Sequence, residues 1–326
     1  AYKAEITEEI NTNLQLAFDE PEVDCDQTKE LKEVYKDFDY QNISPESNTI
    51  ENIRFVDAIS QGLEQSMYRH NELIIMGQDV ADYGGVFKIT EGFVPKFGKS
   101  RVRNTPICES GIVSTAMGLS INGMKAVVEM QFADFVSSGF NPIVNYLAKV
   151  HYRWNEKADV VIRMPCGGGV GAGPFHSQTN EAWFTKTPGL KVVYPAFPDD
   201  AKGLLNTAIN DPNPVLFFEH KGLYRSIKGD VPTDYYTLPL GKAKLLQEGN
   251  SISVVTYGAG VHWALEILEN HPEIDVDLID LRTLQPLDTE AIFNSVKKIN
   301  PDDKSAQLYI DRCNHMKKNP PKGTWD

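Results

Sequence analysis

Apolar residues form short runs that alternate with helical spacings from residue 52 onward. Continuous apolar runs, which are typical of buried strands, cover residues 73–77, 125–131, 159–164, 190–194 and 215–219. Helical patterns cover residues 112–121, 143–150 and 199–209. Because strands that alternate with helices build βαβ units, the pattern predicts an α/β fold with a parallel sheet that is covered on both faces.

A second unit is predicted after a polar stretch near residues 226–245. Residues 251–257 and 276–281 predict strands, residues 261–270 predict a helix, and Asp288 caps a helix that runs to Lys298. This pattern is again βαβ, but it covers only part of an α/β domain. From residue 301 a basic, proline-containing tail follows, in which we predict no strand.

The first fifty residues differ from the rest in pattern and charge. One amphipathic helix is predicted over residues 3–18, where apolar side chains recur at steps of four (Ile6, Ile10, Leu14, Phe18). Residues 20–50 are polar and acidic and predict a linker. Residues 1–50 carry −9 of the net charge of −13, through 13 acids and 4 lysines. The helix either docks on another surface or is a frayed terminus.

Composition excludes several classes of protein. The 326 residues are 41% hydrophobic and 24% charged, as in globular proteins, and no basic run suits a nucleic-acid backbone. No apolar run is long enough to span a membrane, and the N-terminus lacks a signal-peptide pattern. The cysteines lie far apart, which disfavours disulfides and a zinc site (Cys25, Cys108, Cys166, Cys313). We therefore expect a cytoplasmic protein that binds neither nucleic acid nor membranes.

The common nucleotide-binding and hydrolase motifs are absent: GxGxxG, GxxxxGK[ST], GxSxG and HExxH do not occur. Residues 167–173 (GGGVGAG) lack the Lys-Ser/Thr of a Walker-type phosphate loop. This segment is either a mobile connection or a place where a ligand approaches the backbone closely.

Glu109 lies in the segment TPICESG (105–111), directly before a helix of small residues. One interpretation is an acid that stabilises the helix N-terminus. The other is a carboxyl held in an apolar cleft, where it exchanges a proton with a heterocycle.

His176 follows the glycine loop, in a position that a flexible strand-end loop could expose. Both a structural role and an acid–base role remain open for it.

The turn at residues 208–214 ends a helix with two prolines, so the last helical carbonyls need other partners. A capping side chain, water or a monovalent cation could supply them.

Residues 50–300 resemble the beta subunit of the thiamine-diphosphate-dependent decarboxylating component of 2-oxo acid dehydrogenase complexes, a transketolase-like family. The matching segments are MGQDVADYGGVFKITEGF (76–93), TPICESGI (105–112), EMQFADF (129–135), HSQ (176–178), PGLKVVYP (188–195), DAKGLL (200–205) and LRTLQPLD (281–288). Residues 1–22 resemble the closing helix of an alpha subunit. The resemblance implies an alpha-like helix and linker (1–48), a pyrimidine-binding α/β domain (49–228), a partial transketolase C-terminal-like domain (240–300) and an unmatched tail (301–326).

The resemblance also implies roles for individual residues. Glu109 matches the glutamate that bonds the aminopyrimidine ring, Phe135 matches an aromatic ring that packs on the pyrimidine, and Tyr83 matches a cofactor-side position. His176 matches the histidine that assists acyl transfer to a lipoyl group. A structural potassium site is implied at carbonyl-rich positions (Val160, Ala208, Ile209, Asp211, Asn213).

Two departures from the family pattern stand out. The Gly-Asp-Gly motif that binds diphosphate and magnesium is absent, and the resemblance places it on the alpha part. Gln78 stands where many relatives carry glutamate, so a proton relay through that position is in doubt.

The function implied is oxidative decarboxylation of a 2-oxo acid with transfer of the acyl group to lipoyl. Residues 217–225 (FFEHKGLYR) favour branched-chain substrates. The alternatives are a pyruvate or acetoin dehydrogenase beta subunit, or a non-catalytic assembly subunit. The implied partners are an alpha subunit or fused alpha part, a second beta copy and the lipoyl-bearing acyltransferase core.

Overall fold

The computed structural model describes residues 1–22 and 27–318, and it divides the chain into two units, Ala1–Leu31 and Lys32–Asp326. Cys25, part of the expected linker and the end of the expected tail lie outside the described residues. Helix α1 (Tyr2–Asp19) confirms the predicted amphipathic helix, and α2 (Gln27–Lys32) follows it. The apolar side chains Ile6, Ile10, Leu14 and Phe18 are all exposed on α1.

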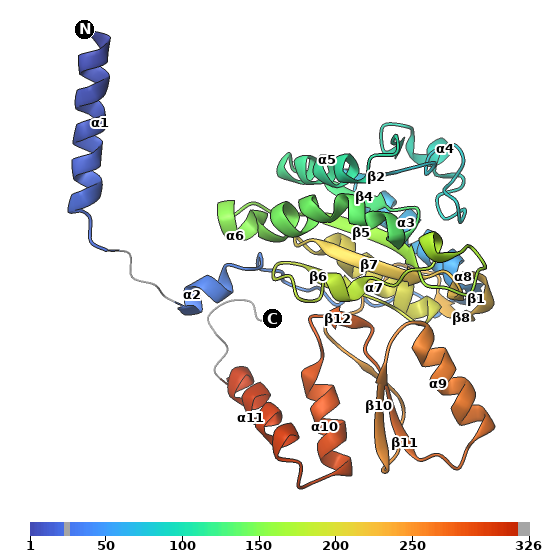
Figure 1. The fold of residues 1–326 in the computed structure, drawn as a ribbon. Coiled ribbons are helices and arrows are strands. Elements are labelled where there is room, and N and C mark those ends of the chain that lie inside the picture. The colour runs from blue at the N-terminus through green and yellow to red at the C-terminus, as the bar shows by residue number, and fades with distance from the viewer. Residues whose placement is uncertain (23–26, 319–326) are drawn as a thin grey trace. The chain divides into compact units, whose positions relative to one another are not determined.

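The larger unit is built on a seven-stranded sheet of order β12-β6-β7-β5-β4-β2-β3 (Figure 1). Its strands are β2 (Leu73–Gly77), β3 (Val102–Asn104), β4 (Lys125–Glu129), β5 (Val160–Cys166), β6 (Lys191–Val193), β7 (Val215–His220) and β12 (Thr283–Gln285). All neighbouring pairs are parallel except β12 with β6. The predicted α/β class with a parallel sheet is confirmed.

Successive residues of the central strands enter two different apolar cores. Val127 and Val161 belong to the core under helices α3 (Phe55–Arg69) and α7 (Pro198–Asn210). Their neighbours Val128 and Ile162 belong to the core under α5 (Glu109–Ile121). Because both faces are covered, the strands are mostly apolar on both faces rather than alternating between apolar and polar residues.

The helical segment predicted at residues 143–150 is irregular. It is a chain of short turns: 3-10 helix η1 (Ala133–Gly139), π-helix η2 (Pro142–Tyr146), 3-10 helix η3 (Leu147–Lys149) and α6 (Val150–Trp154). Pro142 has no backbone N–H to donate, which is one reason why a regular α-helix does not continue here. The remaining short elements of this unit are α4 (Phe93–Phe97), η4 (Pro174–His176), η5 (Glu181–Trp183), α8 (Leu223–Ser226) and the antiparallel pair β1 (Ile50–Arg54) and β8 (Lys228–Pro232).

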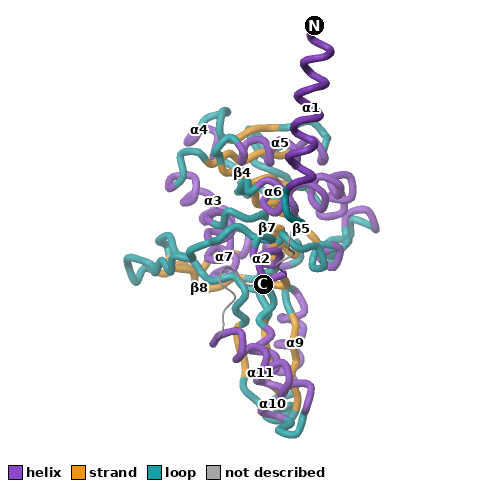
Figure 2. Tube along the Cα trace, turned by 90° about the vertical axis from the view of Figure 1, so that its left-hand side faces the viewer, coloured by secondary structure: helices purple, strands orange, loops and turns teal. Residues whose placement is uncertain are grey.

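A smaller sheet of order β10-β11-β9 follows in the same unit. Figure 2 shows its helices gathered at the end of the unit away from α4 and α5. Its elements are β9 (Lys244–Gln247), β10 (Ile252–Thr256), β11 (Val276–Asp280), α9 (Ala259–Asn270), α10 (Thr289–Ile299) and α11 (Lys304–Lys318). The side chain of Asp288 caps α10 as predicted, because it accepts the N–H of Ala291 at 3.1 Å.

Helix α11 lies in the tail where no element was predicted. Its Tyr309 stacks on Phe293 of α10 with ring centroids 4.4 Å apart, and Ala306 is buried. No helix in the described parts of the chain combines the length and apolar character that a membrane span requires.

Residues 35–49, expected as part of a linker, lie bonded to the α/β domain as an extended strap. Lys36 donates its N–H to Asn213 Oδ1 at 2.8 Å and accepts Asn213 Nδ2 at 2.9 Å. Ile43 exchanges two hydrogen bonds with Thr237. The strap carries no helical or strand pattern. Its backbone groups form hydrogen bonds with side chains and loops rather than with a neighbouring strand.

Candidate active site

Glu109 is the first residue of α5, and only 8% of it is exposed. Its Oε1 accepts a hydrogen bond of 3.1 Å from Nε2 of Gln78, which follows the end of β2. The partial positive charge of the helix N-terminus favours a carboxylate here. Glu109 thus lies at the start of a helix and is buried, and the two interpretations stay open.

An aromatic cluster lies beyond the end of β4, the strand next to β2. Phe132 contacts His176 edge to face at 4.7 Å, and Phe135 contacts the same imidazole at 5.5 Å. A Cβ added to Gly139, at the end of η1, would lie 3.5 Å from the carbonyl oxygen of Glu109. Helix η1, which carries Phe135, therefore packs against the start of α5, and Glu109, Phe135 and His176 belong to one region.

Tyr83 stands apart from this group. It is 56% exposed, and the ammonium of Lys88 lies 3.5 Å from the centre of its ring. In the described residues, no hydrogen bond or ring contact joins Tyr83 to Glu109, Phe135 or His176.

The glycine loop connects β5 to His176 and requires its glycines. Gly167 has φ +84°, and a Cβ there would lie 2.2 Å from Nε2 of His220. Any larger residue at 167 would clash with the imidazole of His220, the last residue of β7. The loop therefore approaches another strand end closely, which is the setting in which α/β sheets bind ligands.

A fully buried ion network crosses the middle of the sheet. Arg163 on β5 binds both oxygens of Glu219 on β7, at 2.8 and 2.7 Å, and Oε2 of Glu129 on β4, at 2.6 Å. Tyr224 donates to Glu219 Oε2 at 2.5 Å. Burial raises the pKa of Glu129, while the neighbouring carboxylates raise the pKa of Arg163.

This network was not predicted from the sequence. The only available signal is three charged residues inside otherwise apolar strands. A Cβ on Gly85 would lie 3.3 Å from Glu129 Oε1, so the loop between Gln78 and Glu91 rests on the network. The network thus supports the floor of the region that contains Glu109.

The turn after α7 frees several backbone carbonyls. The carbonyl of Ala208 would accept the N–H of residue 212 in a continued helix, but residue 212 is Pro212 and has no N–H. Ile209 would accept the N–H of Asn213, but that N–H donates to Asp211 Oδ1 at 3.0 Å. Asp211 Oδ2 binds Lys191 at 2.6 Å.

The same turn lies against the start of β5, because Ala158 donates its N–H to the carbonyl of Pro212 at 2.9 Å. Val160 is the first residue of β5. The predicted cation ligands are therefore neighbours, and all are buried (Val160, Ala208, Ile209, Asp211, Asn213). Freed buried carbonyls fit a monovalent cation.

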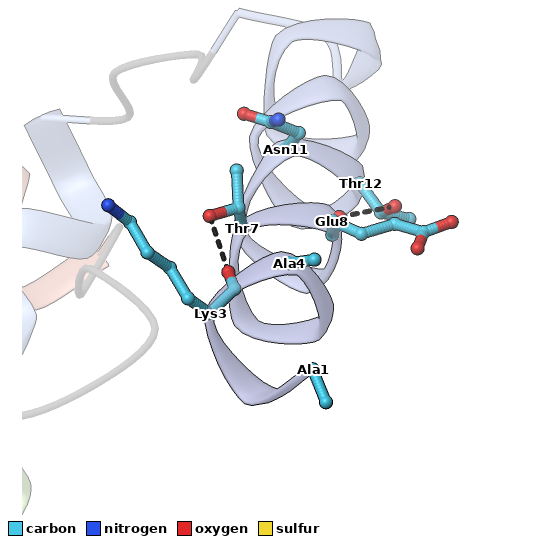
Figure 3. Close-up of a pocket in the computed structure, with 7 residues that line it drawn as sticks. All are labelled: Ala1, Lys3, Ala4, Thr7, Glu8, Asn11 and Thr12. Carbon is cyan, nitrogen blue, oxygen red and sulfur yellow. Dashed lines mark hydrogen bonds between the residues drawn. The ribbon is translucent and has the colours of Figure 1, made fainter.

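The hollow shown in Figure 3 is not a candidate site. Its lining residues are Ala1 and residues of α1, and all are exposed. Among them, Thr7 and Thr12 donate their hydroxyls to the carbonyls of Lys3 and Glu8. One face of a single helix supplies no opposing wall, and a ligand site needs one.

Comparison with known families identifies both regions of the larger unit. Residues 51–227 match the family "Transketolase, pyrimidine binding domain", and residues 241–301 match "Transketolase, C-terminal domain". A solved structure, "Split gene transketolase, inactive beta4 tetramer", superposes with a TM-score of 0.58 over 75% of this chain and 76% of that one. At 21% sequence identity this likeness concerns the fold alone.

Curated relatives are much closer in sequence. The chain is 46% identical to "2-oxoisovalerate dehydrogenase subunit beta" of Bacillus subtilis, over 75% of this chain and 76% of the relative. It is 43% identical to "Pyruvate dehydrogenase E1 component subunit beta" of Acholeplasma laidlawii, over 76% of each. The chain therefore belongs to the E1 beta-subunit family of the 2-oxo acid dehydrogenases, which is built on transketolase-type pyrimidine-binding and C-terminal domains.

Proposed function

We propose that this chain is the beta part of a thiamine-diphosphate-dependent 2-oxo acid dehydrogenase that decarboxylates a 2-oxo acid and transfers the acyl group to lipoyl. The observation that carries the proposal is the buried Glu109 at the N-terminus of α5, with Phe135 and His176 on the elements beside it. Thiamine diphosphate, when bound, supplies the carbanion chemistry that releases carbon dioxide.

Three residues of this chain have distinct roles in the proposal. Glu109 would hold the aminopyrimidine ring of thiamine diphosphate and carry the proton that this ring requires, and its burial would keep water away from that proton. Phe135 packs on the ring. His176 lies at the end of the glycine loop, where it assists transfer of the acyl group to the lipoyl arm.

Tyr83 has a weaker place in the proposal, because it lies on the surface under Lys88. We assign it to the rim of the cofactor site rather than to its floor. The diphosphate and its magnesium belong to the alpha part, since this chain has no Gly-Asp-Gly motif. The working enzyme then needs an alpha subunit or fused alpha part, a second beta copy and the lipoyl-bearing acyltransferase, and we expect it in the cytoplasm.

Branched-chain 2-oxo acids are the proposed substrates, on the basis of residues 217–225 (FFEHKGLYR). Pyruvate or acetoin dehydrogenase activity is the alternative, because the relatives include a pyruvate dehydrogenase beta subunit. A non-catalytic assembly subunit is a further alternative, but assembly alone does not require a carboxyl as deeply buried as Glu109.

The experiment is reconstitution of the protein with its alpha part and thiamine diphosphate, followed by 2-oxo-acid-dependent dye reduction. We expect higher kcat/KM with branched-chain 2-oxo acids than with pyruvate. A preference for pyruvate would select the alternative substrate. No turnover of any 2-oxo acid by a correctly assembled protein would contradict the proposed activity.

We also propose that potassium binds the carbonyls of the turn after α7, with Val160 beside them. Potassium should raise the melting temperature of the protein more than sodium does, because a cation that binds only the folded state stabilises it. Pro212→Ala restores an N–H that can bond the carbonyl of Ala208, so it should reduce this difference, whereas Pro272→Ala on the surface should not. Equal melting temperatures in the two salts would contradict the site.

A further inference from the structure

One carboxylate ties the loop that carries His176 to helix η1. Asp134 Oδ1 accepts hydrogen bonds from the backbone N–H groups of Ser177 and Gln178, both at 3.1 Å. Asp134 is only 7% exposed. Because the acceptor is a carboxylate with little access to water, these two bonds are stronger than ordinary backbone bonds.

The two hydrogen bonds that Asp134 accepts, which we call the tether, lie where the glycine loop ends. Residues 169–175 are exposed, whereas Gln178 accepts the N–H of Gly167 at 3.0 Å and Asn180 Nδ2 donates to the carbonyl of Ala133 at 2.9 Å. His176 is therefore the last residue before the anchored segment. The two N–H groups that Asp134 binds follow it directly, so Asp134 determines where the imidazole stands.

A buried lysine, Lys221, lies in the same region as Asp134. Asp134 Oδ2 and Nζ of Lys221 are both buried, and within the described part of the chain neither has a hydrogen-bond partner. The Lys221 ammonium lies 5.3 Å from the centre of the Phe132 ring, which also contacts His176. Burial lowers the pKa of Lys221, and attraction to Cys166 and Asp134 opposes this effect.

We propose that Asp134 is a positioning residue for His176. The inference rests on the proposed function, in which His176 assists acyl transfer to lipoyl. A carboxyl oxygen accepts hydrogen bonds, as the two N–H groups require. Loss of the tether should therefore impair acyl transfer while leaving the region around Glu109 intact.

The first test is hydrogen–deuterium exchange on the full protein assembled with its alpha part. Asp134→Ala should speed amide exchange at Ser177 and Gln178 by about tenfold or more, because each amide loses a bond to a charged group. Asp134→Asn keeps an acceptor oxygen and should stay closer to the unaltered protein. Asp82→Ala, at an exposed acid, should have no effect on these two amides.

The second test separates the two half-reactions. Asp134→Ala should lower lipoyl acylation by about tenfold or more and dye-coupled decarboxylation by no more than about twofold, with partial recovery in Asp134→Asn. Asp134→Asn preserves the size of the side chain, so it keeps the tether falsifiable if Asp134→Ala does not fold. Equal losses in both half-reactions, or unchanged exchange at residues 177 and 178, would overturn the proposal. If the unaltered protein turned over no 2-oxo acid, the proposed function would fail, and the exchange data would still decide whether the tether exists.

Discussion

At the scale of single residues, the strongest constraint on this domain is a buried charge network rather than an apolar contact. Arg163 is fully buried and binds two carboxylates on the neighbouring strands. Arg163 is the shared partner of both carboxylates, and each would be an uncompensated buried charge without it. Burial raises the pKa of Glu129 even with Arg163 beside it.

Arg163→Met should therefore destabilise the protein by about 3–5 kcal/mol, the usual cost of breaking a buried ion pair from one side. Chemical denaturation monitored by circular dichroism would measure the free energy of unfolding. Arg153→Met, at an exposed arginine, is the matched control and should change it by less than about 0.5 kcal/mol. A similar small change for both variants would show that the network contributes little.

At the scale of elements, the central strands were predictable because each is a continuous apolar run. Residues 73–77 and 215–219 were expected as strands and form β2 and β7. The short strands β1 and β8 were missed because they lie at the surface of the domain, where no apolar run is needed. Helix α11 was missed because much of its length is exposed, although Tyr309 stacks on Phe293 of α10 and Cys313 Sγ lies 3.6 Å from Thr289 Oγ1.

The site was predictable only in part, for a related reason. Glu109 and His176 stood out through their neighbours in sequence, a small-residue helix and a glycine loop, but their roles were left open there and were implied only by the family resemblance. The bond from Gln78 to Glu109 joins residues 31 positions apart, and the bond from Arg163 to Glu219 joins residues 56 apart. Contacts at such separations depend on strand order, which local patterns do not specify.

The strap of residues 35–49 provides a test at this scale. Asn213 holds Lys36 through both a donor and an acceptor. Asn213→Ala removes both bonds, so we expect limited proteolysis within the strap to become about tenfold faster or more. Asn250→Ala, at an exposed asparagine, should not change the rate. Unchanged proteolysis of the strap after Asn213→Ala would show that other contacts hold it.

At the scale of the whole molecule, the two sheets of the larger unit meet through Asp280 at the end of β11. Its Oδ1 accepts the N–H of Arg282 at 3.1 Å, and Arg282 binds Asp200 of α7 at 2.9 Å. Burial raises the pKa of Asp280 from 3.8 to about 7, and the nearby Asp200 adds to that increase. The junction between the sheets therefore contains an acid that prefers to be neutral.

The raised pKa of Asp280 predicts how the stability of the protein depends on pH. Between about pH 4 and pH 7 the folded protein holds the Asp280 proton and the unfolded chain does not, so stability falls as pH rises, by as much as about 4 kcal/mol from this group. Asp280→Asn cannot ionise and should be more favourable, relative to the unaltered protein, at pH 8 than at pH 4. Asp302→Asn, at an exposed acid, should show no such trend. Thermal unfolding at pH 4 and pH 8 measures the difference in stability between Asp280→Asn and the unaltered protein. The same difference at both pH values would contradict this prediction.

At this scale, the net charge is also distributed unevenly along the chain. Residues 1–50 carry −9 of the −13, and α1 leaves its apolar side chains exposed. The remaining residues, which include both transketolase-type domains, carry only −4.

The central claim is that Glu109 activates thiamine diphosphate, and Glu109→Gln tests it most directly. The substitution preserves side-chain size and leaves an amide oxygen for the bond from Gln78. In the protein assembled with its alpha part, we predict that cofactor binding is retained, measured by calorimetry, while 2-oxo-acid-dependent dye reduction falls by about 100-fold or more. Glu266→Gln, at an exposed glutamate, should retain full activity. Near-normal dye reduction by Glu109→Gln would contradict the account.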